Sequence, residues 1–209
     1  MRRIHFYPNT KDEKHCYQAS LRMVLKYFLP HENFTFKHLD AMTGHIKGLW
    51  TWPMRGAIAI RNLGLRVINI EPFDYQSFSS TPKEYLYAFA GRDVAEIQIQ
   101  HSDIESEKQN AEEFMQKIEL ERRQPKYKDI IDLLSKKYLL ICNINAKTLN
   151  RKRGYIGHFV LVFRATKYNV WLHDPGLPPR KKRRVTRRVF EESWAYPNED
   201  AKNILAFTV

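Results

Sequence analysis

Three residues that lie far apart in the sequence carry the side chains of a thiol-based catalytic site: Cys16, His158 and Asp174. A helix should begin at Cys16, and the free N–H groups at a helix start stabilise a thiolate, the nucleophilic form of cysteine. An imidazole can take and return the proton of such a thiol, and a carboxylate can hold the imidazole in the required tautomer. The three residue types therefore suit acyl transfer through a thioester.

The elements that position these residues follow from local patterns. The run from Lys14 to Phe28 has an apolar stripe at helical spacing, and Pro30 ends it. Capping residues and the positions of proline and glycine predict the other helices, and short apolar runs predict strands. The expected helices are 14–28, 36–44, 53–64, 82–91, one that begins at Pro125, and 187–194. The expected strands are 65–70, 138–145, 157–164, 168–174 and 204–209.

Strands 138–145, 157–164 and 168–174 are apolar on both faces, which predicts central positions in a sheet. A short turn near Thr166 would place His158 and Asp174 on neighbouring strands, and alternation would turn both side chains to one face. That face would also carry four apolar side chains, those of Val160, Val162, Val170 and Leu172. We expect the first helix to pack on the same face and so to bring Cys16 to His158.

Composition favours one folded domain. The chain has 209 residues, of which 43% are hydrophobic and 13% aromatic, enough for a sizeable core. Helices come first and strands second, and no Gly/Ser linker interrupts them. The sequence therefore predicts a single α+β domain over 1–209, with N-terminal helices packed on an antiparallel sheet. The segment at about 102–124 is charged and has only a thin apolar stripe, so we expect a solvated helical insertion or a mobile one.

Several classes of protein and site are disfavoured by what the sequence lacks. No apolar stretch is long enough to span a membrane, and the N-terminus does not have the pattern of a signal peptide. Two cysteines, Cys16 and Cys142, do not make a disulfide scaffold, so a reducing, cytoplasmic location is expected. Neither CxxC nor HxxxH spacing occurs, so we expect no metal and no cofactor, and we expect no membrane partner.

Each candidate residue also has a structural interpretation. Cys16 can be a small buried hydrophobic residue, His158 a hydrogen-bonded core histidine, and Asp174 part of an Asp-Pro-Gly turn. Cys142 lies in the middle of an apolar strand and is expected in the core. His173 neighbours Asp174 but should point to the opposite face, where a structural role is expected.

A basic run follows the third candidate residue closely. Net charge is +12, and much of the excess lies in Arg180, Lys181, Lys182, Arg183 and Arg184, followed by Arg187 and Arg188. Such a run is typical of a nuclear localisation signal, a nucleic-acid patch or a solvated loop. It contains no interleaved aromatic residues, which disfavours single-strand binding. Because it lies next to the candidate site in sequence, it can also select acidic or phosphorylated substrates.

Three segments together resemble the C39-like peptidases, a group with the papain-like cysteine peptidase fold. They are HCYQASLRMVLKYF, GHFVLVFRATKYNVWLHDP and RRVFEESW. In that family a Cys begins the first helix, a His begins a strand, and an Asp followed by Pro ends the next strand. A later helix carries Phe-x-x-x-Trp, matched by Phe190 and Trp194. The order Cys then His, roughly 140 residues apart, is also that of papain-like enzymes. The resemblance implies that Cys16 is the nucleophile, His158 the general base and then acid, and Asp174 the orienting residue.

The chain departs from the family pattern at the oxyanion site. A Gln usually lies six residues before the Cys; here that position is Thr10, with Asn9 beside it. Asn9 is the first candidate for a replacement amide donor, and Thr10 the second through its hydroxyl. Losing one such donor costs about 3 kcal/mol of transition-state stabilisation.

Three functions stay open on the sequence. The first is a cysteine peptidase or a related thiol acyl-hydrolase or acyltransferase, acting on a peptide or acyl substrate, with acidic substrates among the candidates. The second is an inactive papain-like domain that binds a peptide or protein in its groove. The third is a nucleic-acid-associated protein that uses the basic run.

Overall fold

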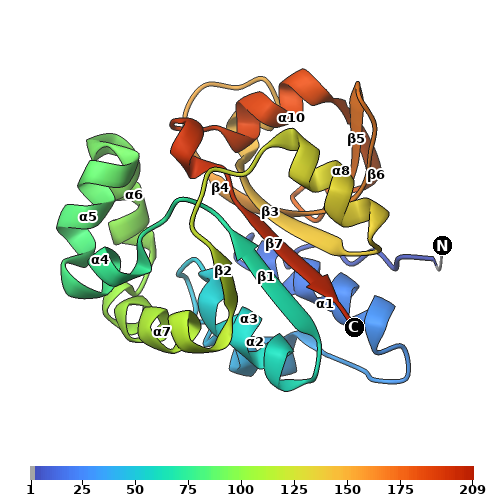
Figure 1. The fold of residues 1–209 in the computed structure, drawn as a ribbon, viewed down its shortest axis with the longest axis horizontal. Helices are drawn as coiled ribbons and strands as arrows, with labels where there is room; N and C mark the ends of the chain where they lie inside the picture. The colour runs from blue at the N-terminus through green and yellow to red at the C-terminus, as the bar shows by residue number, and fades with distance from the viewer. Residues whose placement is uncertain (1–2) are drawn as a thin grey trace.

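The computed structural model describes residues 3–209, and an open mixed sheet forms their centre (Figure 1). Its seven strands have the order β2-β1-β7-β3-β4-β5-β6, and every neighbouring pair is antiparallel except β1 and β2. The strands are β1 (Arg66–Ile70), β2 (Glu119–Glu121), β3 (Leu139–Asn145), β4 (Gly157–Ala165), β5 (Asn169–Asp174), β6 (Arg180–Thr186) and β7 (Ile204–Thr208). The chain is an α+β protein, as the sequence predicts.

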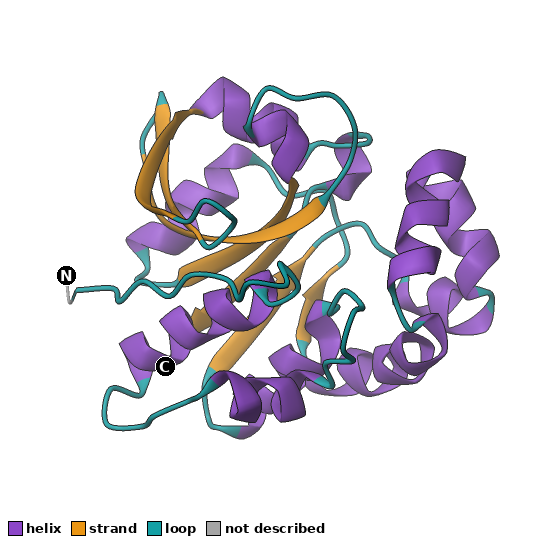
Figure 2. Cartoon of the chain, turned by 180° about the vertical axis from the view of Figure 1, so that it is seen from behind, coloured by secondary structure: helices purple, strands orange, loops and turns teal. Residues whose placement is uncertain are grey.

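Helices cover both faces of this sheet (Figures 1 and 2). The helices before β1 are α1 (Cys16–Phe28), α2 (Phe36–Thr43) and α3 (Pro53–Asn62). Those that follow are α4 (Tyr75–Ser80), α5 (Pro82–Ala90), α6 (Arg92–His101), α7 (Ile104–Lys117), α8 (Tyr127–Ser135), α9 (Ala146–Leu149) and α10 (Arg187–Trp194), and a short 3-10 helix spans Glu199–Ala201. Figure 1 shows α4, α5 and α6 grouped beside the β2 end of the sheet.

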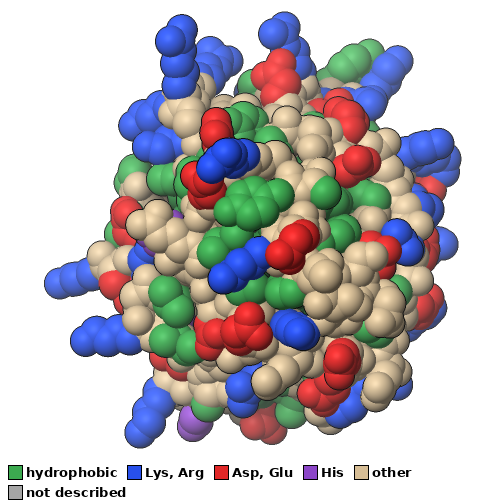
Figure 3. Space-filling view, turned by 90° about the vertical axis from the view of Figure 1, so that its left-hand side faces the viewer, with side chains coloured by type: hydrophobic (Ala, Val, Ile, Leu, Met, Phe, Trp, Pro, Cys, Tyr) green, Lys and Arg blue, Asp and Glu red, His purple; other side chains and the backbone are tan. Residues whose placement is uncertain are grey.

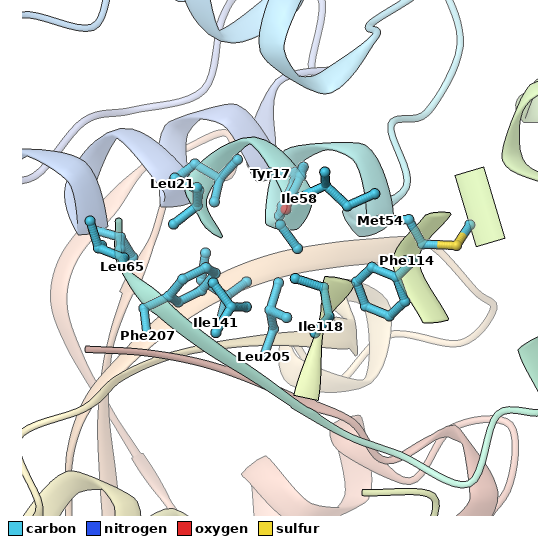
Figure 4. Packing of buried hydrophobic residues seen from close by; sticks show 14 of the residues in the cluster. Tyr17, Leu21, Met54, Ile58, Leu65, Phe114, Ile118, Ile141, Leu205 and Phe207 are labelled. Atoms are coloured by element: carbon cyan, nitrogen blue, oxygen red, sulfur yellow. The ribbon is translucent and has the colours of Figure 1, made fainter. Parts of the chain in front are cut away.

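The first face of the sheet is covered by α1, α3 and α7. Their inner side chains pack on alternate residues of the central strands, including Ile141, Leu205 and Phe207 (Figure 4). Tyr17 and Leu21 of α1 belong to this cluster. This apolar layer fixes the direction of α1 and therefore the place where that helix begins.

The second face is covered by α8 and α10. The buried side chains on this side include Cys142, Val160, Val162, Phe190 and Trp194. Because both faces of β3, β4 and β5 are buried, these strands are central, as their apolar runs predict.

One expectation about the register is wrong. Val160, Val162, Val170 and Leu172 share a face, as expected, but α1 packs on the opposite face, against Phe159 and Leu161 of β4. The reason is that each face of β4 is apolar enough to bury a helix, so alternation alone does not say which helix takes which face. α8 and α10 take the face assigned to α1.

The charged segment at about 102–124 is helical, as expected, but it is part of the core. Its thin stripe is buried: Ile104, Phe114 and Ile118 are each at most 6% exposed. After α7 the chain forms β2, which pairs in parallel with β1 and extends the sheet. A narrow apolar stripe is enough to bury one side of α7, because this helix packs mainly against two other helices, α3 and α4.

Three α-helices and two strands were not predicted from the sequence: α4, α6 and α9, and β2 and β6. Asp74 begins α4 by accepting the N–H groups of Gln76 and Ser77, and α6 follows α5 directly after Gly91. The expected basic loop is instead the edge strand β6, paired with β5. Charged side chains are compatible with an edge strand, because one side of its backbone and much of its surface face water. The basic composition of the run therefore concealed its extended structure.

Candidate active site

Cys16 is the first residue of α1, and a short loop before it sets its position. His15 precedes the helix, and its backbone N–H donates to Oδ1 of Asn9 over 2.8 Å. The N–H of Asn9 in turn donates to the carbonyl of Pro175 over 2.7 Å. This bond joins the loop before the cysteine to the turn that follows Asp174, although the two lie more than half the chain apart.

His158 and Asp174 meet at the ends of β4 and β5. Nε2 of His158 donates to Oδ1 of Asp174 over 2.8 Å, and both side chains are buried. The same carboxylate oxygen accepts the N–H of Gly176 over 3.0 Å. Since Nε2 is held by the carboxylate, Nδ1 is the imidazole nitrogen left for Cys16.

His158 reaches Cys16 even though α1 lies on the other face. His158 is the second residue of β4, at the end of the sheet where α1 also begins, and both side chains line one cavity. At the end of a strand the sheet no longer separates its two faces, so a side chain there can turn past it. The hydroxyl of Ser20 donates to the carbonyl of Cys16 over 2.9 Å and lies 3.5 Å from the carbonyl of Phe159, so the start of α1 lies directly against β4.

The ionisation of this pair favours a thiolate and an imidazolium. Burial opposes the charge on Cys16, but the hydrogen bond and charge of His158 outweigh it, so the thiol pKa lies below its ordinary value. For His158, burial again opposes the charge, and hydrogen bonds to Asp174 and to Cys16 raise the imidazole pKa to about 10. Burial also works against Asp174, yet His158 and Arg183 lower its pKa to about 2. The nucleophilic form of Cys16 is thus stabilised near neutral pH.

Arg183, a residue of the basic run, is also a member of the site. Its Nη1 donates to Oδ2 of Asp174 over 2.7 Å, and its Nη2 donates to the carbonyl of Leu149 and to Oδ1 of Asn150. It therefore holds the carboxylate and ties it to the end of α9. Val185, two residues further, is the signal that could have revealed this, because alternation along a strand gives both residues the same inward side.

Asn9 has the geometry of an oxyanion donor. Its Oδ1 accepts two backbone N–H groups, from Thr10 and His15, so the amide oxygen points back into the loop. The amide NH₂ must then point the other way, and within residues 3–209 it has no hydrogen-bond partner. Asn9 lines the same cavity as Cys16. An amide donor without a protein partner, in the lining of the cavity that holds the thiol, is the kind of group that an acyl oxyanion requires.

Thr10 is placed differently. Its hydroxyl lies 2.5 Å from Oδ1 of Asp12 and 2.6 Å from Nδ1 of His15, and the residue does not line the cavity. The geometry therefore favours Asn9 of the two candidates.

The other two candidate groups have structural surroundings. Cys142 is fully buried in the cluster under α8 and α10, and burial raises the pKa of its thiol. His173 is 1% exposed, packs between the rings of Phe6 and Phe163, and accepts the N–H of Lys182 at Nδ1. His173 thus points away from Asp174, as the strand alternation predicts.

A cavity of about 1050 Å³ opens at Cys16. Its floor is the α1 face of the sheet, and its far wall comes from α5 and α6. Its lining is rich in aromatic side chains, among them those of Trp50, Trp52, Phe73, Phe89, Tyr155 and Tyr196. A volume of this size accommodates several residues of an extended peptide or a bulky acyl group.

No model of a known protein family matches this sequence, and a comparison with curated proteins finds no match. Between residues 3 and 209, no three His, Cys, Asp or Glu side chains are grouped so as to hold a metal ion. In the same part of the chain, no helix has the length and apolar character needed to cross a membrane.

The two cysteines should differ strongly in reactivity. We expect iodoacetamide to alkylate Cys16 before Cys142, and Cys16 should react well below pH 9, the ordinary range of a thiol. Mass spectrometry of peptides after brief labelling at several values from about pH 5 to about pH 9 measures both sites.

His158→Asn provides the control for this experiment. It removes the positive charge beside the thiol, so the pKa of Cys16 should rise and labelling near pH 6 should fall by about tenfold. Equal labelling of the two cysteines in the native protein, or an unchanged pH profile in His158→Asn, contradicts the ion pair.

Proposed function

We propose that this chain is a papain-like cysteine hydrolase, a peptidase or a related thiol acyl-hydrolase or acyltransferase. The observation that carries the proposal is the constellation of Cys16, His158 and Asp174 in the lining of a large cavity, with the imidazole hydrogen-bonded to the carboxylate and close enough to the thiol to lower its pKa. The resemblance of three segments to the C39-like peptidases supports the same conclusion. So does the arrangement of a helix that begins at the cysteine and a sheet that provides the histidine and the acid.

The chemistry assigned to these residues is acyl transfer in two steps. The thiolate sulfur of Cys16 attacks a carbonyl carbon, and the carbonyl electrons move onto the oxygen. As this intermediate collapses, the bond from carbon to the leaving nitrogen or oxygen breaks, and the imidazolium of His158 gives that atom its proton. A thioester on Cys16 and a free amine or alcohol result.

The second step returns the enzyme to its starting state. The neutral imidazole of His158 takes a proton from water, and the hydroxide oxygen attacks the thioester carbon. The carbon–sulfur bond then breaks, an acid is released, and the thiolate and imidazolium form again. An amine in place of water gives transfer instead of hydrolysis.

Asn9 and Asp174 stabilise the two charged groups of the reaction, the oxyanion and the imidazolium. The amide NH₂ of Asn9 and the backbone N–H of Cys16 are the donors for the oxyanion. Asp174, held by Arg183 and by the N–H of Gly176, keeps Nε2 of His158 protonated so that Nδ1 faces the thiol. With an amide donor in the loop before Cys16, the missing glutamine has a local replacement, and catalysis is favoured over the inactive binding domain.

The proposal is tested by trapping the thioester. p-Nitrophenyl acetate should leave one acetyl group on Cys16, detectable by mass spectrometry of the intact protein and removed by neutral hydroxylamine, which cleaves thioesters. Cys142→Ala should still form this adduct, whereas Cys16→Ala should form none. An acetyl group found on a lysine, or absent from the native protein, rules out the proposed function.

A further inference from the structure

The lining of the cavity has an uneven distribution of charge. Five cationic side chains reach it and have no ion-pair partner among residues 3–209: Lys14, Lys147, Arg151, Lys152 and Arg180. The carboxyl groups in the lining are those of Glu13, Glu71 and Asp174. Asp174 is bound by Arg183 and His158, and Glu71 is hydrogen-bonded to Tyr75 and Asn69. Positive charge in this cavity is therefore largely uncompensated.

Most of these cations come from the part of the chain that carries His158. Lys147 belongs to α9, and Arg151 and Lys152 follow in the connection that leads from β3 into β4. Arg180 begins β6 and pairs with Asp174 in the β5–β6 register. Arg183 links the two segments, since it bonds both Asp174 and the carbonyl of Leu149. The segments that carry Lys147, Arg151, Lys152 and Arg180 thus lie at the end of the sheet where His158 lies.

The position of the imidazole indicates which part of a bound substrate lies near these cations. His158 must lie next to the leaving atom in order to give it a proton. The chain that leaves with that atom therefore extends along the side of the cavity where His158, α9 and the start of β6 lie. Uncompensated cations on that side favour a leaving segment with negative charge, and they disfavour a basic one.

Building on the proposed function, we propose that the substrate is a peptide with acidic side chains directly after the bond that is cleaved. Carboxylates and phosphates share the chemistry that these cations recognise, so aspartate, glutamate and phosphoserine are the side chains expected there. Lys147, Arg151 and Lys152 are the residues that recognise them.

Binding to the Cys16→Ala chain tests this selectivity without requiring catalysis. The probes are four fluorescein-labelled peptides with the common start Phe-Ala-Ala-Gly-Ala, which end in three glutamates, three phosphoserines, three glutamines or three lysines. Fluorescence polarisation in a buffer of moderate ionic strength should show that the glutamate peptide binds about tenfold more tightly than the glutamine peptide. The lysine peptide should bind weakest, and the comparison of glutamate with phosphoserine identifies which anion fits.

Charge variants locate the effect. In the same Cys16→Ala chain, Lys147→Gln, Arg151→Gln and Lys152→Gln together should remove the preference for glutamate. The matched control is Arg61→Gln, Lys83→Gln and Lys136→Gln, which removes equal charge from exposed residues outside the cavity lining and should keep the preference. Such a control is needed because Lys and Arg side chains also occur among Asp and Glu over the face that Figure 3 shows.

Three results overturn the proposal: equal binding of the glutamate and glutamine peptides, equal loss in the two triple variants, or tighter binding of a single-stranded oligonucleotide than of any peptide. The last result assigns the cations to nucleic acid. Failure here is separate from failure of the proposed function, because the acetyl adduct on Cys16 depends on the thiol and the imidazole and not on these three cations.

Discussion

Cys16→Ala and His158→Ala should each abolish enzymatic acetyl transfer, a loss on the order of ten-thousandfold or down to the uncatalysed background. The thiol is the atom that forms the bond, and the imidazole keeps it ionised. Because the two groups act as a unit, the double variant should be no slower than Cys16→Ala alone. The measurement is release of p-nitrophenol, with formation of the acetyl adduct followed in parallel.

The pH dependence separates a chemical role of His158 from a structural one. In His158→Ala the thiol loses the hydrogen bond and charge that lower its pKa, while the burial that raises the pKa remains, so the pKa of Cys16 should lie at or above its ordinary value. The rate of this variant should therefore recover in part only as pH rises above about 9. In the native protein the rate should instead be high near neutral pH. It should fall as pH rises through about 10, where His158 loses the proton that it gives to the leaving atom. A His158→Ala variant with the native rate and profile removes the imidazole from the mechanism.

Asn9→Ala should lower turnover about a hundredfold, the cost of one oxyanion donor, or about 3 kcal/mol of transition-state stabilisation. The variant loses the unpaired NH₂ that lines the cavity, and it also loses the Oδ1 that accepts the N–H groups of Thr10 and His15. Comparison with Asn9→Asp distinguishes these losses. An aspartate keeps both acceptor bonds, replaces the NH₂ donor with an oxygen and adds a negative charge, so its turnover should fall at least as far while the melting temperature stays near native.

Thr10→Val is the matched control for the oxyanion site. The Thr10 hydroxyl bonds Asp12 and His15 and lies outside the cavity lining, so turnover should change only a few-fold. Native turnover in Asn9→Asp, or a hundredfold loss in Thr10→Val, assigns the donor to another group.

Much of the fold follows from local patterns in the sequence. The stripe in α1, the proline that begins α3 and the threonine that caps α10 specify helices because they satisfy a helix's own geometry. The apolar runs of β3, β4 and β5 specify central strands because both faces must be buried. The short helix α4 and the edge strand β6 were not predicted, because most of their residues are polar or charged and so have the composition of a loop.

The sequence alone determined which residues have the chemistry: a cysteine at a helix start, a histidine at the start of a strand and an aspartate at the end of the next one. It also offered Asn9 as an amide near the cysteine. The tertiary structure decided how they meet. Only packing shows that α1 lies on the opposite face from Val160, that His158 reaches Cys16 at the end of the sheet, and that Asn9 lines the same cavity as Cys16. The physical reason is that helix and strand propensities are local. The face that a helix covers depends instead on contacts between segments distant in sequence. So does the pairing of a buried carboxylate, as Asp174 with Arg183 shows.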